Sequence, residues 1–140
     1  MSETTTSAAV PADGTTGRSV IVVGYSASAE GRAALRRALS EATLRGSGLV
    51  VVHTAADAEI GELTSELQAS GVPYEVRSAG DALDPADELL RAAESTDAEF
   101  IVIGLRRRSP VGKLLLGSNA QRVLLDAACP VLAVKATPDG

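Results

Sequence analysis

Five short apolar runs, separated by segments long enough to form helices, constrain the fold of this chain more than any other feature. They are Val20–Val23, Leu49–Val52, Val72–Arg77, Phe100–Ile103 and Val131–Val134. Four of them are unbroken apolar rows rich in Val, Ile and Leu, which is typical of strands buried on both faces of a parallel sheet. The fifth, Val72–Arg77, alternates, with Val72, Tyr74 and Val76 on one side. Strands that alternate with helices form such a sheet, and the helices cover both of its faces. The sequence therefore predicts a doubly wound α/β fold.

The segments between these runs carry the signals of helix ends. The first helix is predicted to begin at Ser26 or Ser28, because a serine side chain can accept a hydrogen bond from the first turn. Residues 57–70 carry apolar residues on one face and predict a second helix. Asp84 and Pro85 suit the N-cap and the first position of a third helix. The first three connections between successive runs are thus predicted to be helices, as a parallel sheet requires.

A chain of 140 residues is expected to form one domain. Residues 1–18 are mostly Thr, Ser, Ala, Gly and Pro and are predicted to be a disordered tail. Residues 19–136 are predicted to be the folded domain, and residues 137–140 a C-terminal tail. The first residues have neither the basic nor the apolar region of a secretory signal, so a cytoplasmic location is expected.

The stretch from Phe100 to Val134 carries the signal for a binding site. The strand ends on Gly104, and Gly117 precedes a helix in which Ser118 and Gln121 form a capping-box pattern. Between the two glycines lies a predicted loop with the basic residues Arg106, Arg107, Arg108 and Lys113. The apolar stripe predicted for the helix is Val123, Leu124, Ala127 and Ala128. A phosphate could satisfy the unpaired N–H groups at the start of this helix. The alternative is that the glycines serve turns and the arginines are simply solvated, and these residues alone leave both readings open.

The same residues resemble the C-terminal signature of the universal stress protein family, whose nucleotide-binding members carry Gly-x2-Gly-x9-Gly-Ser/Thr. The spacing matches from Gly104 to Gly117 and Ser118, but Arg107 stands where the second glycine is expected. The resemblance extends across residues 20–135. It implies a Rossmann-like fold of the adenine nucleotide alpha hydrolase type, with five parallel strands in the order 3-2-1-4-5.

In a sheet of that order, the ligand crevice lies at the carboxyl ends of the first and fourth strands, where the strand order reverses. The resemblance implies that Gly24, Tyr25 and Thr54 line the nucleoside part of a bound nucleotide. The candidates for the phosphate part are Gly104, Arg106, Arg107, Gly117, Ser118 and Asn119. The nucleotide that the resemblance implies is ATP or a related adenine nucleotide, with Mg²⁺ as a possible companion.

Two residues depart from the family pattern. The family usually has an aspartate at the end of the first strand, within Asp-x-Ser, whereas this chain has Gly24. A carboxylate hydrogen bond to the nucleoside is thereby lost. Arg107 could bind phosphate through its guanidinium group, or it could fill the pocket, and the sequence leaves both open.

Composition excludes several other classes of function. A net charge of −5 and 2% aromatic residues argue against binding to nucleic acid or to an anionic membrane. Cys129 is the single cysteine, so no intramolecular disulfide can form. The acidic residues Asp81, Asp84 and Asp87 suit a helix start better than a metal site. No paired general acid and base emerges, so slow ATP hydrolysis is the most that is expected of this chain as an enzyme.

Two hypotheses of function follow. The first is a stress-response module that binds an adenine nucleotide, and the second is a dimer of the universal stress type that acts through protein–protein association without a nucleotide. Both include a homodimer. In the implied strand order Val131–Lys135 is a sheet edge, and such an edge can pair antiparallel with its own copy. The resemblance points the same way, because universal stress proteins commonly dimerise through this strand.

Overall fold

The computed structural model describes residues 19–54, 57–79, 84–107 and 114–136. Within them the strands are β1 (Val20–Tyr25), β2 (Gly48–His53), β3 (Tyr74–Ser78), β4 (Phe100–Arg107), β5 (Leu114–Leu115) and β6 (Val131–Lys135). The helices are α2 (Ala29–Arg45), α3 (Asp57–Ser70), α4 (Pro85–Thr96) and α5 (Ser118–Asp126). The predicted tails, residues 1–18 and 137–140, lie outside the described residues, and so does Asp81. The limits of the domain therefore stay a prediction.

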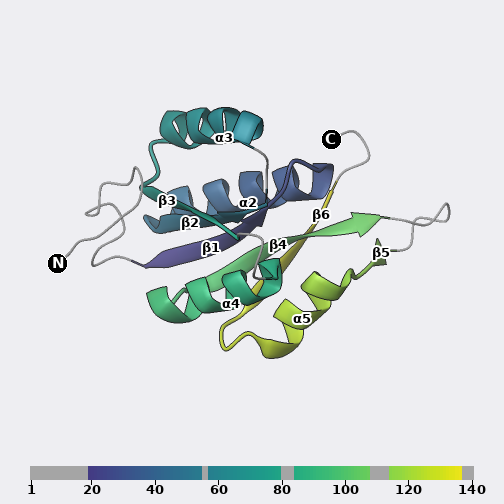
Figure 1. Ribbon diagram of the computed structural model, residues 1–140. Helices are drawn as coiled ribbons and strands as arrows, with labels where there is room; N and C mark the ends of the chain where they lie inside the picture. The colour runs from purple at the N-terminus through teal and green to yellow at the C-terminus, as the bar shows by residue number, and fades with distance from the viewer. Residues whose placement is uncertain (1–18, 55–56, 80–83, 108–113, 137–140) are drawn as a thin grey trace.

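The sheet confirms the predicted strand order. Its parallel strands lie in the order β3-β2-β1-β4-β6, so β6 is the fifth strand of the sequence prediction (Figure 1). β5 is an addition that the sequence did not predict. Leu114 and Leu115 pair antiparallel with Arg107 and Arg106, so β4 continues to Arg107 where a loop was expected. The main chain of β5 thus supplies partners for β4 beyond Gly104.

Two aliphatic cores hold helices against the two faces of the sheet. Alternate residues of β1 point to opposite faces: Ile21 and Val23 pack under α2 and α3, whereas Val20 and Val22 pack against α4 and α5. Figure 1 shows α2 and α3 on one side of the sheet and α4 and α5 on the other. Because Val20–Val23 are almost completely buried, the central strand has the unbroken apolar row that the sequence predicted.

The first helix confirms its predicted start. Ser28 is the N-cap of α2, and its Oγ accepts a hydrogen bond from the N–H of Gly31 at 3.1 Å. The helix ends at Arg45 and is capped by Gly46, whose φ of 68° lies in the left-handed region that glycine tolerates best. Asp84 and Pro85 also take their predicted places at the start of α4, although the Asp84 side chain makes no capping hydrogen bond.

The prediction for α5 was wrong in two respects. Gly117 is the N-cap, Ser118 is the first helical residue, and no side chain caps this helix. The buried face is also narrower than expected, since Val123 is buried while Leu124 and Ala128 are exposed. The helix is nine residues long and ends at Asp126, and Ala120, Val123 and Ala127 are the residues of this segment that pack in the core with α4.

None of the helices within the described residues is both long enough and apolar enough to span a membrane.

Candidate functional site

A crevice opens where β1 and β4 separate. Their pairing stops at Val23 and Val102, whereas β1 stays paired with β2 as far as Tyr25 and His53. The carboxyl ends of β1 and β4 therefore diverge at the point where the strand order reverses, which is where α/β sheets bind ligands. A cavity of about 450 Å³ lies there, a size within the range of small-molecule sites.

The structure brings most of the predicted site residues to the wall of this cavity. They are Gly24, Tyr25, Thr54, Gly104, Arg106, Gly117, Ser118 and Asn119. The main chain of Arg107 belongs to β4, but its side chain lies outside the described part of the chain. Contact between any of these residues and a nucleotide stays a prediction.

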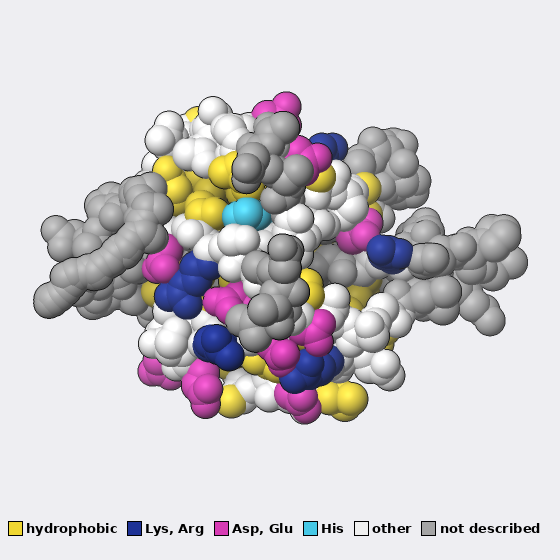
Figure 2. All heavy atoms as spheres, viewed as in Figure 1, with side chains coloured by type: hydrophobic (Ala, Val, Ile, Leu, Met, Phe, Trp, Pro, Cys, Tyr) yellow, Lys and Arg dark blue, Asp and Glu magenta, His cyan; other side chains and the backbone are white. Residues whose placement is uncertain are grey.

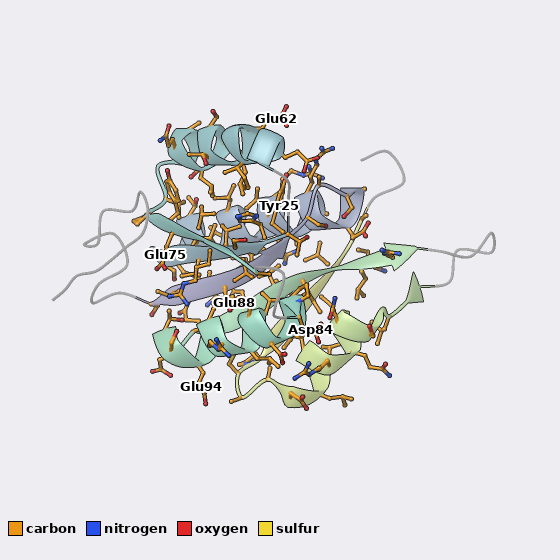
Figure 3. The ribbon with its side chains drawn as sticks, viewed as in Figure 1. Tyr25, Glu62, Glu75, Asp84, Glu88 and Glu94 are labelled. Atoms are coloured by element: carbon orange, nitrogen blue, oxygen red, sulfur yellow. The ribbon has the colours of Figure 1, made fainter. Side chains whose placement is uncertain are left out.

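Tyr25 contributes to the wall while its side chain belongs to a core. It is only 8% exposed and packs in the cluster formed with α2 and α3, on whose side of the sheet Figure 3 shows it. Thr54, Ser118 and Asn119 are exposed, so their polar groups are available to a ligand. The cavity wall therefore combines a tyrosine held in the core with exposed polar side chains.

Sequence reasoning missed the contributions of α2 and α4. Glu30 and Gly31 from the first turn of α2, and Pro85 and Leu89 from α4, also line the cavity. Gly31 is the residue in the sequence that could have indicated that α2 lies close to the cavity. A Cβ atom there would lie 2.6 Å from Ser26 Oγ, so the first turn of α2 accepts only glycine. A glycine in the first turn of a predicted helix indicates such a close approach.

The two motif glycines have different reasons for lacking a side chain. A Cβ atom on Gly104 would overlap the main chain of Glu30, so packing of β4 against α2 already requires glycine there. A Cβ atom on Gly117 would have no atom of the described residues within 4 Å, and the φ of Gly117 is −69°, which any residue adopts. Packing within the protein thus explains why residue 104 is glycine, but it does not explain why residue 117 is glycine.

Gly24 faces the α4 side of the crevice. A Cβ atom at this position would lie 3.1 Å from Cδ1 of Leu89. The wall is therefore aliphatic at the place where the resemblance implies a carboxylate. A ligand would meet Leu89 there through van der Waals contact rather than through a charged hydrogen bond.

Among the helices of the described residues, α2, α4 and α5 begin at the cavity, and their first turns differ in charge. The start of α2 is capped by Ser28 and carries Glu30, and the first turn of α4 carries Asp87 and Glu88. The start of α5 has neither an acidic residue in its first turn nor a side-chain cap. A helix N-terminus carries partial positive charge on unpaired N–H groups. Of the three, α5 is therefore the best suited to accept an anion.

Two groups of ion pairs hold the elements around the cavity. Arg106 donates from Nε to Oε2 of Glu30 at 3.0 Å and so joins the end of β4 to α2. Arg122 on α5 donates to Asp84 Oδ2 at 3.1 Å and also pairs with Asp87. Figure 3 shows Asp84 beside α5, and Figure 2 shows basic and acidic side chains next to one another over α4 and α5. Asp84 and Asp87 thus fix α4 to α5.

Comparison with known proteins identifies the family of this chain. Residues 57–135 match the universal stress protein family. The chain belongs to that family. A universal stress protein of Mycolicibacterium smegmatis is 50% identical over an alignment of 127 residues that covers 83% of this chain and 97% of the relative.

Solved structures of the family have the same fold. A universal stress protein from Archaeoglobus fulgidus superposes with a TM-score of 0.68 and 31% identity, covering 84% of this chain and 98% of that one. The structure of the universal stress protein from Archaeoglobus fulgidus in complex with dAMP has a TM-score of 0.61 and 28% identity, with the same coverage. The Rossmann-like α/β architecture predicted from the sequence is therefore confirmed.

Proposed function

We propose that this chain binds an adenine nucleotide in the cavity between β1 and β4. The nucleoside lies against the ends of β1 and β2, at Gly24, Tyr25 and Thr54. The phosphate lies at the start of α5, against Gly117, Ser118 and Asn119. The observation that carries the proposal is the open space at Gly117 beside an uncapped helix N-terminus. A phosphate there would satisfy N–H groups that no side chain of this helix caps.

A related protein supports the choice of nucleotide. The universal stress protein from Archaeoglobus fulgidus that is 28% identical to this chain was solved with dAMP, an adenine nucleotide. ATP is the form to which the family motif points, and any Mg²⁺ would arrive bound to its phosphates. The role proposed for the chain is regulatory, in the stress response, and its cytoplasmic location stays a prediction.

Thermal unfolding in the presence of nucleotides tests this proposal. A ligand that binds only the folded state, at a free concentration 100 times its dissociation constant, stabilises that state by about 2.7 kcal/mol. We expect ATP, ADP or AMP to raise the unfolding temperature of the full chain, and UTP at the same concentration and ionic strength to raise it less. Equal shifts with ATP and UTP would contradict recognition of adenine, and the absence of any shift would favour the second candidate below.

The second candidate is a dimer of the universal stress type that acts through protein association without a nucleotide. The aliphatic wall at Gly24 and Leu89 favours it, because no carboxylate is there to bind a nucleoside. In both candidates we propose a homodimer formed by β6, which within the described residues pairs with β4 on one side only. The outer edge of Val131–Lys135 is then paired antiparallel with the same strand of a second copy.

A further inference from the structure

Glu30 and Arg106 are the charged members of the cavity wall within the described part of the chain, and they neutralise each other. Their side chains are 22% and 55% exposed, and 3.0 Å separates Glu30 Oε2 from Arg106 Nε. A cation that would otherwise attract phosphate is thus occupied by a carboxylate of the same protein. A ligand with several negative charges would meet Glu30 as well as Arg106.

The backbone of Glu30 is fixed at this place. Its carbonyl group packs directly on Gly104, where a Cβ atom would come within 2.6 Å of the carbonyl carbon of Glu30. The first turn of α2 is also capped by Ser28. The carboxylate can therefore leave the cavity only by a side-chain rotation that breaks its pair with Arg106. Glu30 is held beside Gly104, in the wall of the same cavity as Gly117 and Ser118, where the proposed function places the phosphate.

We propose that Glu30 is a charge-selecting residue, which lowers the affinity of the cavity for a ligand with each phosphate that the ligand adds. This inference rests on the proposed function. Two effects have the same sign: the carboxylate repels phosphate directly, and it holds Arg106 so that the guanidinium group does not bind phosphate. Glu30 therefore sets the preference among adenosine, AMP, ADP and ATP rather than the recognition of adenine.

The substitution Glu30→Gln separates this role from a structural one. It keeps the size of the side chain and removes its charge, so Arg106 is released. We expect the affinity for ATP to rise about threefold to tenfold, that for AMP to rise less, and that for adenosine to change by less than about twofold. Raising the salt concentration from 50 to about 500 mM should reduce the gain, because the pair is partly exposed to solvent. If the pair of Glu30 with Arg106 served only to hold α2 against β4, its loss would lower all of these affinities.

Glu41→Gln is the matched control. Glu41 lies on the same helix and pairs with Arg37 at 2.9 Å and with Arg45 at 3.2 Å, but it does not line the cavity. The same change of charge there should leave the ratio of ATP to adenosine affinity within about twofold of the wild type. If Glu41→Gln raises that ratio as much as Glu30→Gln does, the net charge of the protein is responsible and the inference is overturned.

Titrations of the full chain with adenosine, AMP, ADP, ATP and inorganic tripolyphosphate complete the test. An unchanged or lower ratio of ATP to adenosine affinity in Glu30→Gln overturns the role of Glu30 while the proposed function stands. If no adenine compound binds, but tripolyphosphate binds Glu30→Gln more tightly than wild type, the proposed function fails and the charge selection stands. If nothing binds to either protein, both fail.

Discussion

Gly104 of β4 lies directly against the main chain of Glu30 in α2. A Cβ atom at Gly104 would overlap the Glu30 carbonyl oxygen and would lie 2.9 Å from the Glu30 Cβ atom. The first glycine of the motif is therefore a packing residue, whatever else it does. Its lack of a side chain lets the start of α2 reach the end of β4, and this contact brings Glu30 to the cavity.

Gly104→Ala should destabilise the fold. The new methyl group meets backbone atoms of α2 rather than a flexible side chain, so α2 or β4 must shift. We expect a loss of about 1–3 kcal/mol or more in the free energy of unfolding, as for other overpacked sites. Urea unfolding of the variant and of wild type measures the difference. Equal stability would show that α2 and β4 do not make this backbone contact.

Gly117→Ser should raise stability and lower nucleotide affinity. Gly117 is the N-cap of α5 with φ −69° and ψ 167°, a conformation that serine adopts readily, and a Cβ atom there would meet no atom of the described part of the chain within 4 Å. The hydroxyl group would cap the N–H groups that the proposed function assigns to phosphate, with a gain of a few tenths of a kcal/mol, up to about 1 kcal/mol.

Unfolding by urea and a titration with ATP measure the two effects of Gly117→Ser on the same protein sample. We expect the free energy of unfolding to rise and the affinity for ATP to fall. A stabilised variant that binds ATP as tightly as wild type would show that the phosphate lies elsewhere, because the hydroxyl group and the phosphate would not be competing for the same N–H groups.

Ala133→Pro should break the dimer and leave the protomer folded. The N–H of Ile101 donates to the carbonyl oxygen of Pro130, so the alternation of a parallel pair turns the N–H groups of Leu132 and Val134 toward β4. The N–H of Ala133 then points away from β4, to the open edge. Proline at this position removes a donor from the proposed interface only.

Leu132→Pro is the matched control for the dimer, because it removes a donor that faces β4 and should destabilise the protomer itself. Sedimentation at micromolar concentration measures the assembly, and circular dichroism measures the fold. A wild type that sediments as a monomer would contradict the β6 dimer, as would an Ala133→Pro variant that stays dimeric.

Cys129 should react slowly with alkylating reagents. The residue is half-buried against the α4–α5 core, and burial raises the pKa of its thiol, with the negative charge of Asp97 adding to the effect. The reactive thiolate is therefore scarce at pH 8, and the rate of reaction with iodoacetamide should keep rising above pH 9. The urea-unfolded chain is the control and should react faster at pH 8. Equal rates for the folded and unfolded chains would contradict the burial of this thiol.

The sequence predicted the fold well because the signals for it are local. Each of the five parallel strands is marked in the sequence by a short stretch of apolar or alternating residues. The order of strands and helices along the chain then restricts the sheet to few arrangements. The crevice followed from the strand order, since a doubly wound sheet opens where that order reverses. These signals do not require knowledge of which side chains meet.

The features that the sequence missed depend on contacts between distant segments. Glu30 and Arg106 are 76 residues apart, and their pairing depends on the close packing at Gly104. Ser118 was predicted to cap α5, but the helix begins one residue earlier than the capping-box pattern implies, so its hydroxyl group caps nothing. A shift of one residue at a helix start is within the usual uncertainty of sequence patterns, and here it changes the role of a site residue.

Calorimetric titration of the full wild-type chain with ATP, ADP and AMP is the decisive test of nucleotide binding in the cavity between β1 and β4. We expect saturable binding of at least one of them at one site per chain, with an affinity that Gly117→Ser reduces. We also expect UTP to bind more weakly than ATP. If no adenine nucleotide binds at concentrations up to millimolar, this cavity is not a nucleotide site.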